Sequence, residues 1–210
     1  DVNDGVNSVS VAASINVLAQ APDLSEESDS DGDGTSDADE GAGDSDGDGI
    51  PDYEDDITSS NTIMTNSGVM ESEPGTTLRL GTIALTTERN EASVTEAEVS
   101  IVENTTEDQS YDYPADLTDF EVTGAEFGHS YIVVMQLSVA ITEDAVYRKY
   151  SVRGGWADFV ENATNAISSA MTVEGVCPEL GSDAYTPGLT AGNNCLQLLI
   201  EDGGPNDADG

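Results

Sequence analysis

Alternation of apolar and polar residues predicts short strands along the second half of this chain. The longest alternation covers residues 131–141, and five apolar side chains share one of its faces: Val133, Met135, Leu137, Val139 and Ile141. Ile132, Val134 and Ala140 partly cover the opposite face. A strand that is apolar on both faces is covered on both sides, so we expect this one to be central in its sheet.

Shorter apolar runs predict further strands around it, at residues 77–85, 96–103, 120–122, 145–152 and 195–200. Residues 156–171 fit either one face of a helix or two strands, and we favour a hairpin that turns at 162–165. Short strands separated by Gly and Asn turns are typical of sandwiches. The pattern therefore predicts an all-β fold, an Ig-like or jelly-roll-type β-sandwich over residues 76–210.

The first twenty residues form a separate arm, in which apolar residues occupy the odd positions Val9, Val11, Ala13, Ile15 and Val17. This period of two predicts a strand with one apolar face. Two interpretations remain open. The arm is either the first strand of its own sandwich, or a donor strand that completes the sheet of a neighbouring subunit.

An acidic segment, residues 21–56, and a polar connector, residues 57–75, separate the arm from the sandwich. From residue 29 the chain reads DSDGDGTSDADEGAGDSDGDGIPDYEDD. Two twelve-residue loops repeat acids at positions 1, 3, 5, 9 and 12 with Gly at position 6. Those acids are Asp29, Asp31, Asp33, Asp37 and Glu40, then Asp44, Asp46, Asp48, Asp52 and Asp55.

This spacing is suited to calcium, which takes about six to eight oxygen ligands at about 2.3–2.6 Å. Alternate residues of a tight loop aim carboxylates at one centre, Gly permits the sharp turn, and the carbonyls of Thr35 and Ile50 at position 7 can add an oxygen. A solvated acidic linker is the alternative, but a random acidic run would not repeat this grid. We therefore predict that the segment binds Ca²⁺.

The flanking sequences decide which kind of calcium loop this is. An EF-hand needs an apolar helix on each side, whereas APDLSEES precedes the first loop and only GAG separates the two. The tandem DxDxDG units, the second ending in GIPDYED, resemble thrombospondin type 3 repeats over residues 29–56. That resemblance implies an irregular chain wrapped around calcium ions. Thr35-Ser36 replaces the Ile-Pro of the pattern in the first unit.

Net charge excludes several partners. The chain has 43 acidic and 5 basic residues, a formal charge of −38, and residues 23–56 hold 16 of the acids and no base. Nucleic acids and anionic membrane surfaces both attract basic patches, so neither is expected as a partner. A disordered acidic chain is also excluded, because 37% of residues are hydrophobic and several segments alternate regularly.

Two cysteines, Cys177 and Cys195, are expected to form a disulfide in an oxidising compartment, with a pair of buried thiols as the alternative. No segment has the roughly 18 apolar residues of a membrane span, so we predict no direct membrane insertion. We expect a signal peptide and any C-terminal anchor to lie outside the given sequence.

The last third of the chain carries a second resemblance. Tyr147-Arg148-Lys149-Tyr150, Gly155-Trp156, Cys177-Pro178, YTPGLT at residues 185–190, Cys195 and residues 200–210 resemble the choice-of-anchor U domain of bacterial surface proteins. The resemblance is strong over about 65 residues and extends back to about residue 77. It implies secretion and display at the surface of a bacterium, and it implies no reaction.

Catalytic signals are weak. The lone histidine, His129, lies in a turn-like segment where solvent exposure is the ordinary outcome, and no phosphate loop or zinc spacing is present. We therefore predict a non-catalytic, secreted calcium-binding structural protein. Its finer form is a filament subunit that assembles by exchange of the arm. The alternatives are a monomeric adhesin or stalk module and, less favoured, a secreted hydrolase.

Overall fold

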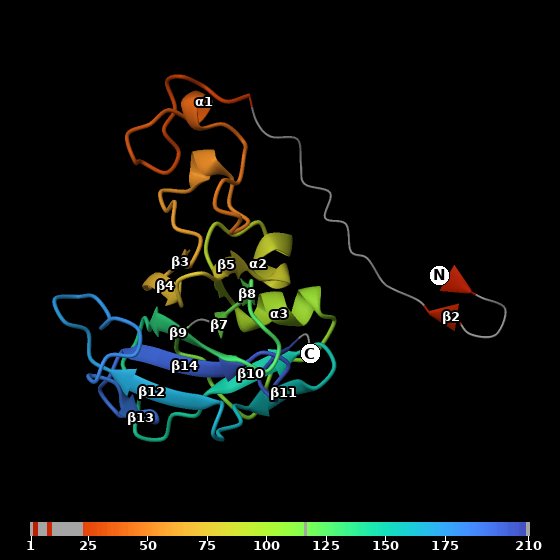
Figure 1. Ribbon diagram of the computed structural model, residues 1–210, viewed down its shortest axis with the longest axis vertical. Coiled ribbons are helices and arrows are strands. Elements are labelled where there is room, and N and C mark those ends of the chain that lie inside the picture. The colour runs from red at the N-terminus through yellow and green to blue at the C-terminus, as the bar shows by residue number, and fades with distance from the viewer. Residues whose placement is uncertain (1, 4–7, 10–22, 116, 209–210) are drawn as a thin grey trace.

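One antiparallel sheet forms the main layer of the protein, in a computed structural model that describes residues 2–3, 8–9, 23–115 and 117–208 (Figure 1). The strand order is β13-β12-β14-β9-β4-β3. Its strands are β3 (Thr62–Thr65), β4 (Gly68–Ser72), β9 (Ser130–Gln136), β12 (Ala166–Ala170), β13 (Thr186–Pro187) and β14 (Cys195–Glu201). The predicted central strand is confirmed over residues 130–136 in β9, which pairs with β14 on one side and β4 on the other. The prediction is wrong for residues 137–141, which lie beyond the end of the strand, and Val139 is exposed.

Three strand pairs and two short helices build the rest of the sandwich. The pairs are β5 (Thr77–Leu80) with β8 (Phe120–Thr123), β6 (Ser93–Val94) with β7 (Leu117–Thr118), and β10 (Arg148–Ser151) with β11 (Gly155–Asp158). They share one apolar core with the main sheet, and its most buried side chains include Ile63, Met70, Leu78, Leu80, Val133, Met135, Leu196 and Leu198. The mostly β architecture confirms the predicted all-β sandwich.

One predicted strand is wrong and another is too long, because helices form in their place. Residues 96–103 form α3 (Glu96–Val102), which begins with a capping box between Thr95 and Glu98. The Glu98 N–H donates to Thr95 Oγ1 at 3.3 Å, and Glu98 Oε2 accepts from the Thr95 N–H at 2.7 Å. The predicted strand at 77–85 ends at residue 80, where α2 (Thr82–Thr86) begins.

The hairpin predicted within residues 156–171 is also wrong in its pairing. A turn does lie at 162–165, where the Asn162 N–H donates to the Asn165 carbonyl at 2.8 Å. The flanking strands, however, join different sheets, since β11 pairs with β10 and β12 pairs with β14. The polar connector at 57–75 supplies β3 and β4, whose Ile63 and Met70 are fully buried.

The predicted disulfide between Cys177 and Cys195 is confirmed. It ties the long β12–β14 connection to the start of β14, where Cys195 is fully buried. Residues 185–190 of this connection pair through β13 with β12, and the Gly188 N–H donates to the Ile167 carbonyl at 2.8 Å. Tyr185 packs in the same small cluster as Cys195.

Little of the N-terminal arm falls within the described residues. β1 (Val2–Asn3) and β2 (Ser8–Val9) pair antiparallel, so Val9 lies opposite Val2. The other predicted assembly positions, Val11, Ala13, Ile15 and Val17, lie outside the described residues. Over the parts of the chain that the structure describes, no helix has the length and apolar character to cross a membrane.

Candidate metal centre

The two acidic loops form a module at one end of the molecule, with irregular backbone around α1 (Asp37–Glu40) and the short 3-10 helix η1 (Asp52–Glu54) (Figure 1). Both loops have the same backbone conformation. Gly32 and Gly47, at position 4, have φ of +84°, and Gly34 and Gly49, at position 6, have φ of +100°. These left-handed values favour glycine, so the DxDGDG spacing specifies the same turn twice.

Carboxylates at positions 1, 3 and 5 brace their loop through backbone N–H groups, and the second oxygen of Asp44 also accepts, from the Gly49 N–H at 3.2 Å. In the first loop Asp29, Asp31 and Asp33 accept from backbone N–H groups two or three residues later, at 2.6–3.1 Å. In the second loop Asp44, Asp46 and Asp48 repeat these bonds at 2.7–3.3 Å. Such short-range bonds fix each side chain against its own turn.

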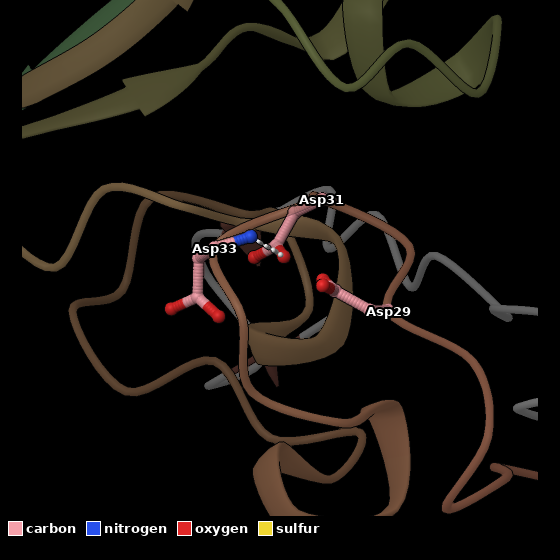
Figure 2. A group of neighbouring side chains, drawn as sticks. All are labelled: Asp29, Asp31 and Asp33. Carbon is pink, nitrogen blue, oxygen red and sulfur yellow. Dashed lines mark hydrogen bonds between the residues drawn. The ribbon is translucent and has the colours of Figure 1, made fainter.

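The braced carboxylates converge on one centre in each loop. Oxygens of Asp29, Asp31 and Asp33 lie within 4.8 Å of one another, as Figure 2 illustrates, and so do those of Asp44, Asp46 and Asp48. Three like charges at this separation repel one another strongly unless a cation lies between them. The structure therefore brings together the predicted ligands at positions 1, 3 and 5 of both loops.

Four carboxylate oxygens in the module are buried and accept no hydrogen bond from the described residues: Asp31 Oδ2, Glu40 Oε2, Asp46 Oδ2 and Asp48 Oδ2. Asp48 is the extreme case, because its side chain is wholly inaccessible to solvent. An ionised carboxylate without a partner is costly to bury. Hard cations such as calcium bind carboxylate oxygens of this kind, so the residues present fit such an ion.

The pKa shifts in the module also fit a bound cation. Burial raises the pKa of Asp48 to about 7, and Asp46, Asp55 and Asp44 add repulsion. Burial also raises the pKa of Asp55 to about 6, with repulsion from Asp46, Asp56 and Asp31. Acids of both loops therefore contribute to the raised pKa of Asp55.

Glu40, at position 12 of the first loop, has its pKa raised by burial and then by Asp31 and Asp33. Glu40 is thus repelled by the acids of its own loop, but it is not one of the three carboxylates that lie within 4.8 Å of one another, and its role as a ligand stays a prediction. Asp55 takes the corresponding place in the second loop. No described contact tests whether the carbonyls of Thr35 and Ile50 bind an ion, so their role stays a prediction.

The position-9 acids have a role that the spacing rule did not reveal. Asp37 accepts from the Ser30 N–H at 2.8 Å and from its hydroxyl at 2.9 Å. Asp52 accepts from Ser45 in the same way, at 2.7 and 2.9 Å. Both acids thus fasten the start of a loop to its end, and their role as direct ligands stays a prediction. The repeated Ser at position 2 is the signal that could have revealed it.

The second loop is anchored in the sandwich. Ile50 is 3% exposed and belongs to the main core, while the Asp48 carbonyl accepts from the Leu80 N–H of β5 at 2.8 Å. Asn90 Nδ2 donates to Glu54 Oε2 at 2.9 Å from the α2–β6 connection. These contacts explain why Asp48 is buried whereas Asp33, its counterpart in the first loop, is exposed.

His129 lies outside this centre. Its side chain is 66% exposed, and its Nδ1 lies 3.4 Å from Glu126 Oε2 across a surface turn. This arrangement holds no buried base beside a nucleophile, which is what acid–base catalysis needs. The absence of catalysis nevertheless stays a prediction.

Comparison with protein-family models, with curated proteins and with solved structures finds no match to this chain. The resemblances to thrombospondin type 3 repeats and to the choice-of-anchor U domain therefore rest on the sequence motifs alone. The disulfide is itself typical of an extracellular or otherwise oxidising environment.

Proposed function

We propose that this chain is a non-catalytic structural protein that binds calcium and acts outside the cell, at a bacterial surface. The observation that carries the proposal is Asp48, a fully buried carboxylate with an unpartnered oxygen beside Asp44 and Asp46. A divalent cation at this point satisfies that oxygen and offsets the repulsion among the three acids.

Calcium would also make the module a rigid extension of the sandwich. The second loop joins the sandwich core through Ile50 and bonds to β5 through the Asp48 carbonyl, and Asp55 is repelled by acids of both loops. An ion in each loop would therefore fix residues 23–56 relative to the core. A rigid link of this kind suits a protein that holds the arm at a set distance from its sandwich.

Location outside the cell is supported by the disulfide and by both family resemblances. Within this proposal the chain self-associates into filaments through the arm, because a head-to-tail contact that does not close gives a fibre. A monomeric adhesin or stalk module is the competing form. The alternation of residues 9–17, interrupted only by Ala12, favours assembly, since an isolated tail gains nothing from an apolar face.

Calorimetric titration of the full chain with calcium tests the proposal. We expect at least two ions per chain, with Asp48→Asn weakening one site at least about tenfold, because a neutral amide oxygen replaces a carboxylate. Asp23→Asn removes the same charge from an exposed position in the same segment and should leave both sites intact. Failure of the wild-type chain to take up calcium at millimolar concentration would refute the proposal.

A further inference from the structure

A cavity of about 1080 Å³ opens between the main sheet and the second layer of the sandwich. Residues of β8 and β10 line it, as do residues of β9 and β14 in the main sheet. Several lining side chains are apolar and only partly buried: Leu117, Phe120, Val122, Leu137, Tyr147 and Ile200. The sandwich thus has an apolar interior that its own described strands leave open.

The edge of β8 that faces away from β5 is unpaired among the described strands. The N–H groups of Leu78 and Leu80 donate to the Ser60 and Asp48 carbonyls, so these residues do not bond to β8. Alternate residues of an antiparallel pair point their backbone groups in opposite directions. Phe120 and Val122, which lie opposite Leu80 and Leu78, therefore direct their N–H and C=O groups away from β5.

The outer edge of β10 is unpaired in the same way over the described residues. The Phe159 N–H donates to the Tyr147 carbonyl at 3.0 Å, which places the bonded positions of this hairpin at odd residues of β10. Arg148 and Tyr150 therefore direct their backbone groups away from β11. Both residues line the cavity, as do Phe120 and Val122.

A strand between β8 and β10 would join two strand pairs into one sheet opposite the main layer. We propose that this cavity is the acceptor for residues 9–19 of a second copy of the chain. The inference rests on the self-association part of the proposed function and is independent of the calcium part. The inserted strand bonds to both free edges and turns its apolar face toward the core.

The sequence of the arm matches this environment. Residues 5–22 carry no charge, although the chain as a whole carries −38. Docking of this segment is therefore not opposed by the repulsion that two such acidic chains exert elsewhere. Its alternating Val, Ala and Ile side chains present the apolar face that an open sandwich lacks, and its polar face carries Ser10, Ser14 and Asn16.

A neighbouring copy is favoured over the arm's own sandwich by the path of the chain. Residues 19 and 23 are four residues apart, a reach of at most about 14 Å. Asp23 enters the first loop, whereas the second loop is the one that packs on the sandwich, and Figure 1 shows the module at the opposite end of the molecule from β11. The arm therefore starts remote from its own β10–β11 pair.

Thiol cross-linking of the full chain tests the acceptor. The chain has two cysteines, and both are in the disulfide, so the introduced cysteines are the free thiols that the cross-linker can join. Ile15→Cys is combined with Val152→Cys, an exposed position that lines the cavity, and a short bismaleimide is added. Ile15→Cys with Ile101→Cys, on the exposed face of α3 outside the cavity, is the matched control.

We expect covalent dimers and larger species with Val152→Cys, at least about tenfold more than with Ile101→Cys. Val122→Cys provides a second position inside the cavity if the first lies out of reach. Equal yields from cavity and control positions, intrachain products alone, or no product from either cavity position would overturn the proposal.

Light scattering of full-length variants gives an independent readout. Ile15→Asp should abolish assembly, because an unpaired charge cannot be buried in the core, whereas Ser14→Asp places the same charge on the polar face and should leave assembly intact. Equal effects of the two variants would argue against an inserted strand. Calcium titration of the same full-length variants separates this inference from the proposed function, because it measures ion binding independently of assembly through the arm.

Discussion

At the residue scale, the carboxylates at positions 3 and 5 of the second loop have two separate roles. One oxygen holds the turn through a backbone N–H, and the other, Asp46 Oδ2 or Asp48 Oδ2, is buried without a hydrogen-bond partner and can bind an ion. Asp44 differs, because both of its oxygens accept backbone N–H groups. These two roles explain why the loops need Asp at alternate positions rather than acidic residues at any position. Asn can still accept the backbone hydrogen bond, but its neutral amide oxygen binds an ion much less well than a carboxylate oxygen.

The effect of Asp48→Asn on stability should therefore have opposite signs without and with calcium. At pH 8, above the Asp48 pKa of about 7, the metal-free protein buries a repelled charge, and the variant removes it. We expect the melting temperature to rise, or to stay level, in chelator and to fall by several degrees in millimolar calcium. Thermal denaturation under both conditions measures this.

Asp23→Asn is the control for that comparison, because Asp23 is exposed and outside both clusters. Its melting temperature should follow the wild type in chelator and in calcium. A fall of Asp48→Asn by the same amount under both conditions would mean that Asp48 is an ordinary structural residue and no calcium ligand.

The residue spacing predicted the loop acids because the rule is local, with every brace spanning two or three residues. It could not predict that Asp48 is wholly buried, since that depends on Leu80 and on the core around Ile50, about thirty residues further along the chain. It also did not reveal the bond from Ser45 to Asp52, which spans seven residues and leaves no trace in apolar periodicity.

At the scale of elements, hydrogen bonds to the first turn explain why two segments form helices. Residues 96–103 alternate enough to resemble a strand, yet Thr95 and Glu98 make a reciprocal cap, and the signature T-x-x-E is visible in the sequence. α2 is different, because its N-terminal N–H groups donate to Asp119, from a distant connection. The sequence signature could therefore have predicted α3, whereas no local signal in the sequence predicts α2.

Thr95→Ala should destabilise the protein by about 1 kcal/mol, because the α3 cap is lost and the Glu98 carboxylate loses a hydroxyl donor. Thr95→Ser should retain most of the stability. Urea denaturation monitored by circular dichroism measures both.

Thr82→Ala is the control for the cap, as it removes a threonine at the start of α2, where Asp119 and not a threonine accepts from the first N–H groups. Its effect should stay within about 0.5 kcal/mol. A similar loss from Thr82→Ala and Thr95→Ala would indicate that threonine content rather than capping matters in these helices.

For the whole molecule, a negative charge of −38 has to coexist with a small apolar core. The charge is densest in the module, which holds 16 of the 43 acids within residues 23–56 and contributes Ile50 to the core. The sandwich is held independently by the main sheet and the disulfide. Removal of calcium should therefore loosen one end of the molecule and leave the other folded, and the two loops should differ.

The first loop should open before the second when calcium is chelated, because Ile50 and the Asp48–Leu80 bond anchor only the second loop in the sandwich. Residues 23–56 contain no Lys or Arg, so trypsin cannot cut there, but Glu-C protease can cut after Glu40. We expect cleavage at Glu40 to be at least about tenfold faster in chelator than in calcium, since repulsion among the first-loop acids is then uncompensated.

Cleavage at Glu126 provides the internal reference, because its side chain is 75% exposed in a surface turn remote from the module. Its rate should not depend on calcium, and mass spectrometry of the fragments follows both sites in one reaction. A rise at both sites would mean that calcium holds the whole sandwich together, and no rise at Glu40 would mean that the first loop keeps its structure without an ion. Only the selective rise fits a stable β-sandwich that carries a calcium-dependent extension.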